Sequence, residues 1–160
     1  MEYSKVYERQ LDRVYRTALL YLQSVDDAED AVQGVFLRFL EKTPVFSDEE
    51  HEKAWFLTVT RNYCKDVQKS FWRRNVNLGT LPDQTAEEEP DQVILETVMA
   101  LQTKYREVVY LYYYEGYSIA EISKMLHRKQ STIQTQLATA RAKLKIELER
   151  RGIVHGRKKD

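Results

Sequence analysis

Cysteine, glycine and proline are scarce in this 160-residue sequence, which contains one Cys, five Gly and three Pro. The single cysteine, Cys64, excludes an internal disulfide and is consistent with a reducing compartment. Cys64 lies within a helical pattern, so we expect a buried structural thiol rather than a nucleophile. The few turn-forming residues, together with 42% hydrophobic and 31% charged residues, favour an all-α globular protein.

Long apolar runs are also missing. No stretch is apolar enough to span a bilayer, and residues 1–10 are polar and lack the apolar segment of a signal peptide. We therefore expect a cytoplasmic protein with no membrane insertion.

The sequence lacks the signatures of a catalytic or metal site. Its histidines, His51, His127 and His155, are scattered, and it contains neither Cys/His metal-ligand spacing nor a glycine-rich phosphate loop. We expect no enzyme activity, no metal and no cofactor.

Charge is segregated along the chain, although the net charge is zero. Residues 1–50 carry 6 Lys/Arg and 11 Asp/Glu, whereas residues 51–80 carry 6 Lys/Arg and 2 Asp/Glu. Residues 81–100 carry no Lys/Arg and 6 Asp/Glu, and residues 101–160 carry 13 and 6. Two basic segments separated by an acidic one predict two contacts with nucleic acid; chance clustering on a solvated surface is the alternative.

Hydrophobic periodicity predicts two small helical domains joined by a flexible acidic linker. The domains are residues 1–75 and 93–150, the linker is 76–92, and a basic tail follows at 151–160. The linker contains Pro82, Pro90 and three consecutive glutamates, and it shows no helical period.

Three helices are expected in the first domain. The first covers about residues 3–23, the second begins at an Asp26 N-cap with Glu29 as its partner, and the third begins near Ser47 or Asp48 and runs to Arg74. The residues of the second helix that we expect to face the core are Ala28, Val32, Val35, Phe36 and Phe39. Its outward face carries Asp27, Asp30, Gln33 and Leu37, which form either a docking surface or a solvated face with one stray leucine.

The third helix carries a basic row beside aromatic residues. The basic residues Arg61, Lys65, Lys69 and Arg73 follow at i+4 spacing, near Trp55. Such a pattern suits an unstacked nucleic-acid strand, because rings stack on bases while cations follow the backbone. A buried aromatic core with a solvated basic edge is equally compatible with these residues.

The second domain is predicted to end in a helix-turn-helix. Ile94, Val98 and Leu101 mark a first helix, and Thr103 caps a second whose core residues are Tyr105, Val108, Val109, Leu111 and Tyr112. Ser118 then caps a third helix in a capping box with Glu121, and the apolar pattern stops at residues 127–129 before it resumes at Ile133.

The last helix leaves a polar face that suits the major groove. Gln side chains can pair with adenine edges, Thr can contact a thymine methyl, and flanking cations can hold phosphates. The polar residues are Thr132, Gln134, Thr135, Gln136 and Thr139, and the cations are Arg128, Lys129, Arg141, Lys143 and Lys145. An ordinary helical hairpin with a solvated face has the same periodicity.

Three motifs together resemble the extracytoplasmic-function (ECF) sigma factors of the sigma-70 family. Val14-Tyr15-Arg16 followed by residues 27–37 is similar to regions 2.1 and 2.2 of that family. Trp55-Phe56-Leu57, Arg61-Asn62 and Asp66 are similar to regions 2.3 and 2.4. Residues 105–118, Glu121-Ile122, Thr132-Ile133 and 140–144 are similar to region 4.

The resemblance implies a subunit that directs bacterial RNA polymerase to promoters. Its expected partners are the polymerase core, through the clamp helices of the largest subunit and the flap region, promoter DNA, and an anti-sigma factor. The implied polymerase-binding residues are Asp27, Asp30, Gln33 and Leu37. The implied −10 residues are Trp55, Arg61, Asn62, Lys65, Lys69 and Arg73. The implied −35 residues are Arg128, Lys129, Ser131, Thr132, Gln134, Thr135, Gln136, Thr139, Arg141 and Lys143.

Among the departures of the chain from the family pattern, two bear on the proposed sites most directly. Gly34 stands where the family usually has Glu, which removes a docking carboxylate and weakens the helix by roughly 1 kcal/mol relative to Ala. His127, Arg128 and Lys129 replace the usual turn, so we expect the cap of the last helix to shift to Ser131. The alternative function is a stand-alone regulator that binds operator DNA and uses its N-terminal helices for dimerisation or sensing.

Overall fold

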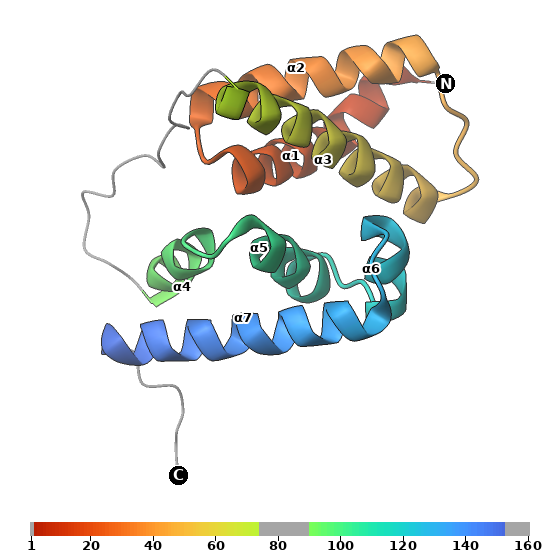
Figure 1. The fold of residues 1–160 in the computed structure, drawn as a ribbon. Coiled ribbons are helices and arrows are strands. Elements are labelled where there is room, and N and C mark those ends of the chain that lie inside the picture. Colours follow the sequence, from red (N-terminus) through yellow and green to blue (C-terminus); the bar gives the residue numbers. More distant parts are fainter. Residues whose placement is uncertain (1, 74–89, 153–160) are drawn as a thin grey trace. The chain divides into compact units, whose positions relative to one another are not determined.

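A computed structural model describes residues 2–73 and 90–152, and this part of the chain is helical with no strand. The elements, in order, are α1 (Tyr3–Leu22), α2 (Val25–Lys42), α3 (Glu49–Arg73), α4 (Pro90–Met99), α5 (Thr103–Val109), the π-helical segment η1 (Tyr110–Tyr114), α6 (Ile119–Leu126) and α7 (Gln130–Arg150) (Figure 1). The expected all-α class is confirmed.

The chain divides into two compact units, residues 1–83 and 84–160. The predicted linker ends sooner than expected, because α4 already begins at Pro90. Proline suits the first position of a helix, where its missing N–H would have had no partner. Residues 76–89 of the linker and 153–160 of the tail lie outside the described residues.

The first unit is a three-helix bundle in which α1 packs against α2 and α3. The five apolar residues that were predicted to face inward from α2 are all buried. Phe36 and Phe39 meet Phe56 of α3, each with ring centroids 5.3 Å apart. Phe39 also contacts Trp55 at 5.9 Å, so aromatic packing joins α2 to α3.

The start of α2 differs from the prediction, and the start of α3 agrees with it. Ser24 is the N-cap of α2, and its hydroxyl accepts a hydrogen bond from the Asp27 amide at 3.2 Å. The expected Asp26 cap was therefore wrong; Asp26 lies in the first turn, where the helix dipole favours its charge. Asp48 caps α3, because its carboxylate accepts from the His51 amide at 2.8 Å.

Gly34 of α2 lies against the Tyr63 ring of α3. A Cβ at this position would lie 2.2 Å from Cε2 of Tyr63, far inside van der Waals contact. Arg38, one turn further along α2, lies over the same ring at 5.2 Å. Position 34 therefore faces the Tyr63 ring of α3, and the loss of a docking carboxylate at this position stays a prediction.

In the second unit, α4 turns a slightly different face to the core than predicted. Val93, Thr97 and Leu101 are buried, whereas Ile94 is 39% exposed and Val98 packs only partly against Leu101. The Thr97 hydroxyl donates to the Val93 carbonyl at 2.7 Å. This internal hydrogen bond lets a threonine take the place of an apolar residue, which hydrophobicity alone did not indicate.

The helix after α4 begins one residue earlier than expected and ends in a π-helical turn. Gln102 is in the N-cap position of α5, and Thr103 is already helical. The Glu115 amide donates to the Tyr110 carbonyl at 3.0 Å, a five-residue step that follows η1. Val108, Val109 and Leu111 are buried as predicted, while Tyr105 and Tyr112 are only partly so.

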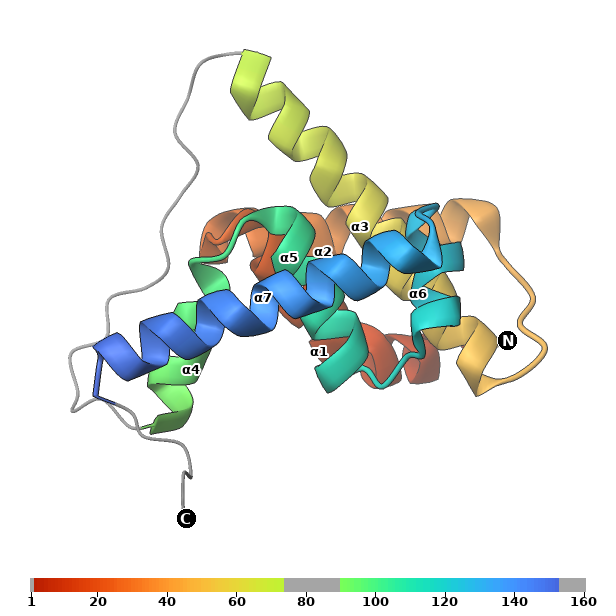
Figure 2. The same cartoon turned by 60° about the horizontal axis from the view of Figure 1, so that its bottom comes forward.

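The long helix α7 packs along α4, α5 and α6 (Figure 2). Its buried residues Ile133, Leu137, Ala140 and Leu148 recur at helical spacing, as the sequence predicted. One stripe of α7 thus holds the second unit together, and the opposite stripe is left on the surface.

Candidate nucleic-acid interface

The helix-turn-helix predicted at residues 118–145 is formed by α6 and α7. The Ser118 hydroxyl accepts from the Glu121 amide at 3.1 Å, and the Glu121 carboxylate accepts from the Ser118 amide at 2.8 Å. Gly116, with φ +81°, ends the preceding segment. Tyr117 and Ile122, which occupy the two positions of a hydrophobic staple around the Ser118 cap, are both buried. These confirmed local contacts fix where α6 starts.

The turn between α6 and α7 differs from the prediction. His127 ends α6 in the left-handed region with φ 57°, and α7 begins at Gln130 with Lys129 in the N-cap position. The expected Ser131 cap was wrong, since Ser131 is already inside the helix. The Lys129 side chain makes no capping hydrogen bond.

Arg128 holds this turn from inside. Its guanidinium forms an ion pair with Glu107 of α5, whose side chain is completely buried. A second guanidinium nitrogen, Nη1, donates to Oε1 of Gln136 on α7 at 2.9 Å. The Ser123 hydroxyl also donates to the Arg128 carbonyl. Arg128 therefore links α5, the turn and α7. The sequence predicted a contact with phosphate for this residue and gave no sign of this structural role.

Glu107 was missed altogether. It stands directly before Val108 and Val109 on the apolar side of α5, and a carboxylate in that position needs a partner when buried. A carboxylate on the apolar side of a helix was therefore the feature of the sequence that could have indicated a buried ion pair. Its partner lies 21 residues away, so no local pattern identified it.

The predicted polar face of α7 lies on the surface, although its members differ in exposure. Gln136 and Thr139 are half-buried. The exposed members are Ser131, Thr132, Gln134 and Thr135. The helix therefore offers a row of short hydroxyl and amide side chains along the side opposite its buried stripe.

Basic side chains flank this polar face. Lys129, Arg141, Lys143 and Lys145 are exposed. Arg141 donates to the Tyr113 hydroxyl at 3.1 Å, and Lys143 lies 5.8 Å from the centre of the Tyr105 ring. Tyr113 was not predicted to take part; its contact orients a cation beside the polar face.

The residues predicted to contact the −10 strand all belong to α3. Asn62 and Lys69 are exposed, while Arg61 and Lys65 are half-buried. Trp55 is half-buried and packs edge-on against Phe46 at 5.9 Å. The side chain of Arg73 lies outside the described residues.

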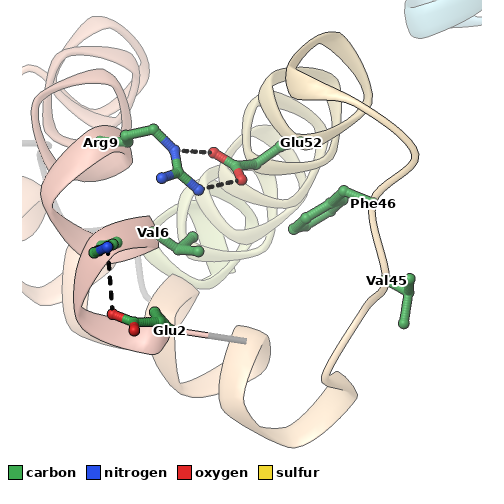
Figure 3. A pocket seen from close by; sticks show the side chains of 7 residues that line it. Glu2, Val6, Arg9, Val45, Phe46 and Glu52 are labelled. Atoms are coloured by element: carbon green, nitrogen blue, oxygen red, sulfur yellow. Dashed lines mark hydrogen bonds and ion pairs between the residues drawn. The ribbon is translucent and has the colours of Figure 1, made fainter.

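A hollow of about 340 Å³ lies beside the loop that precedes α3 (Figure 3). Val45 and Phe46 of the loop line it, together with Arg9 of α1 and Glu52 of α3. It contains none of the residues predicted for the −10 strand. Val45 is 85% exposed, so the loop presents an apolar side chain to solvent.

An ion pair holds the base of this loop. Arg9 donates to both carboxylate oxygens of Glu52, at 3.0 and 2.7 Å, and Gln10 donates to the same carboxylate at 2.6 Å. The hydrogen bonds from Arg9 are the main reason that the pKa of Glu52 is lowered, against the opposing effect of burial. The start of α3, and with it the end of the loop, is thus tied to α1.

The outward face of α2 is exposed as the docking prediction requires. Asp30 and Gln33 are exposed, Asp27 is half-buried, and Leu37 is 59% exposed. Leu40 was not among the predicted docking residues, and it is 48% exposed on the same helix. Two leucines among polar residues could bury apolar area against a partner.

Two predicted absences can be compared with the described residues. Within residues 2–73 and 90–152, no group of three or more His, Cys, Asp or Glu residues is placed to bind a metal ion. In the same ranges, no helix has the length and apolar character needed to cross a membrane.

Comparisons with known proteins match both units. Residues 6–76 match the family model Sigma-70 region 2, and residues 91–144 match Sigma-70, region 4. The chain is 30% identical to the ECF RNA polymerase sigma factor SigL of Mycobacterium tuberculosis over 158 residues, covering 92% of this chain and 89% of SigL. It is 26% identical to SigX of Bacillus subtilis, covering 81% of this chain and 75% of SigX.

A solved structure has the same fold. It is the sigma factor RpoE of Bartonella quintana in complex with the anti-sigma factor NepR, with a TM-score of 0.73 and 21% identity, covering 92% of this chain and 97% of RpoE.

Proposed function

This chain belongs to the ECF group of the sigma-70 family of RNA polymerase sigma factors, and we propose which of its surfaces bind polymerase and which bind the promoter. A sigma factor is a transcription initiation factor rather than an enzyme. The observation that carries the proposal is that residues 6–76 match region 2 and residues 91–144 match region 4, in that order along one chain.

The outward face of α2 is the proposed docking surface for the polymerase core. Leu37 and Leu40 expose apolar area that water disfavours, and Asp30 and Gln33 lie among them as polar neighbours. A partner of mixed apolar and basic character, such as the clamp helices of the largest subunit, would satisfy both kinds of side chain. Burial of Leu37 and Leu40 would supply affinity, and the acidic residues would set orientation.

The exposed edge of α3 is the proposed contact for the melted −10 strand. Asn62 and Lys69 face solvent, and they would contact bases and phosphates of a single strand. The exposed loop around Val45 is the proposed site at which an unstacked base is captured. The Arg9–Glu52 pair supports this role because it ties the start of α3, where the loop ends, to α1.

The exposed face of α7 is the proposed reader of the −35 element in duplex DNA. Thr132 and Thr135 are short enough for the helix to enter the major groove. Lys129, Arg141 and Lys143 stand at its margins, where phosphates would lie. The Tyr113 hydroxyl, bonded to Arg141, would restrict that cation to one orientation.

An anti-sigma factor and a cytoplasmic location complete the proposal. The sigma factor RpoE of Bartonella quintana was solved with the anti-sigma factor NepR, and the fold of this chain is similar to it. We expect this chain to be held by an inhibitor of the same kind. A protein that binds a cytoplasmic RNA polymerase would itself act in the cytoplasm.

Run-off transcription with purified core polymerase and a library of promoters tests the proposal. We expect start-site-specific transcripts that depend on this protein. Leu37→Asp should abolish them without lowering the thermal stability, whereas Leu95→Asp, at a leucine of α4 that is 55% exposed, should keep them. Equal loss with both variants would reject α2 as the docking surface.

A stand-alone regulator would behave differently. It would bind duplex DNA tightly without polymerase and would yield no specific transcript with any promoter. That result would reject the docking and promoter roles together.

A further inference from the structure

Gln136 of α7 is not free to present both ends of its amide to DNA. Arg128 Nη1 donates to Gln136 Oε1 at 2.9 Å. Arginine has only N–H donors, so the amide oxygen must be the atom that faces Arg128, and the amide nitrogen must point elsewhere. The orientation of this amide is therefore decided by its partner.

Arg128 is itself held in place. Its other terminal nitrogen pairs with Glu107, whose side chain is completely buried, while the Arg128 side chain is 19% exposed. Moving the guanidinium toward a phosphate would break its ion pair with a buried carboxylate, which is unfavourable. Arg128 therefore stays beside Gln136 when DNA binds.

This arrangement places the two N–H donors of the Gln136 amide, with the Arg128 guanidinium behind them, at one position of the polar face of α7. Gln136 is half-buried, so part of its amide reaches solvent, and Thr132 and Thr139 lie one helical turn before and after it. The remaining lone pair of Oε1 lies beside the guanidinium. An adenine amino group, whose hydrogens are partly positive, would meet the guanidinium N–H hydrogens that already face Oε1.

The bases differ in how they suit such a position. Guanine offers two acceptors in the major groove, N7 and O6, whereas adenine offers one acceptor and one amino donor. The bidentate pairing of Gln with adenine, expected from the sequence, needs an unhindered carbonyl oxygen. Building on the proposed −35 function, we propose that Arg128 makes Gln136 a donor-only reader that selects guanine over adenine at one position of the −35 element.

The test is run-off transcription with core polymerase and the full chain on promoters with a randomised −35 element. Wild type should enrich guanine at one position, and Gln136→Ala should flatten the preference at that position alone. A good specific contact discriminates by about tenfold, which sets the expected enrichment. Enrichment of adenine by wild type at the position that Gln136→Ala flattens would overturn the inference.

Two further variants separate base reading from structural support. Gln136→Glu keeps a partner for Arg128 but presents only acceptors, so its preference should change to cytosine, whose amino group is a donor. Glu107→Gln keeps a hydrogen-bond acceptor for Arg128, so it should lower the melting temperature and leave the guanine preference unchanged. Retained guanine preference in Gln136→Glu would reject the inference.

Failure of this inference is distinguishable from failure of the proposed function. If wild type gives no specific transcript with any promoter, the sigma-factor roles proposed for the two units fail. If specific transcripts appear but base preference at the Gln136 position is for adenine, or does not depend on Gln136, only the donor-only reading fails.

Discussion

Replacing Gly34 with alanine tests whether the close approach of α2 and α3 is as tight as the structure indicates. The new Cβ would lie 2.2 Å from Cε2, 2.6 Å from Cζ and 2.8 Å from Oη of Tyr63. Carbon atoms pack best at about 3.5–4.0 Å, so the ring would have to move by more than about 1 Å. The movement would also disturb the contact of the ring with Arg38.

Two opposing effects decide the sign of the change in the free energy of unfolding. Overpacking costs about 1–3 kcal/mol, whereas alanine in place of glycine within a helix stabilises by about 1 kcal/mol. We expect Gly34→Ala to destabilise the first unit by about 1 kcal/mol. In a Tyr63→Ala background the clash is absent, so the same substitution should stabilise by about 1 kcal/mol.

The two backgrounds form a double-mutant cycle. Its free energies of unfolding are measured by urea unfolding of the full chain, with tryptophan fluorescence as the signal. Both tryptophans, Trp55 and Trp72, belong to the first unit, so the signal reports its unfolding. The expected interaction energy between positions 34 and 63 is about 2 kcal/mol. A Gly34→Ala effect of the same sign and size in both backgrounds would refute the steric account.

Three other substitutions or treatments test separate contacts. Because the pKa of Glu52 is lowered by the hydrogen bonds from Arg9, its contribution is full above the unfolded pKa near 4.5 and is lost as the pH falls through the lower folded value. The difference in urea midpoint between wild type and Glu52→Gln should therefore be present at neutral pH and disappear in acid; a constant difference would contradict the pair. Burial raises the pKa of Cys64 to about 12, so a thiol reagent at neutral pH should label it only as fast as the first unit unfolds, and rapid labelling of the native protein would contradict its burial. Ser118→Ala should lower the stability of the second unit by about 1 kcal/mol in a circular-dichroism melt, while Ser118→Asp, also a good cap, should keep it; equal losses would argue against the capping box.

Local patterns were predictable where partners lie within one helical turn. The capping box of Ser118 and Glu121 and the apolar stripe of α7 depend on spacings of three and four residues, and both are present. The first positions of helices were less predictable. Asp26, Thr103 and Ser131 were each assigned as caps, but Ser24, Gln102 and Lys129 stand in those positions. Several neighbouring residues can serve as a cap, and the fold selects among them.

Contacts between distant segments could not be predicted from local patterns. The sequence showed Gly34 only as a helix-weakening residue of α2, and the structure places the Tyr63 ring of α3 against it. Arg128 looked like a phosphate ligand because it is basic and lies in a turn, yet it pairs with Glu107 from another helix. Charge and turn position indicate what a side chain can bind, and they do not identify which partner is nearer.

The sequence by itself determined the all-α class, the helix-turn-helix and the resemblance to ECF sigma factors, because these depend on residue spacing within single helices and on short motifs. Only the tertiary structure decided which side chains remain available for other molecules. Packing brings residues that are distant along the chain to within hydrogen-bonding distance, as it does for Glu107, Arg128 and Gln136. Hydrogen-bond donors and acceptors used inside the fold are no longer available to DNA.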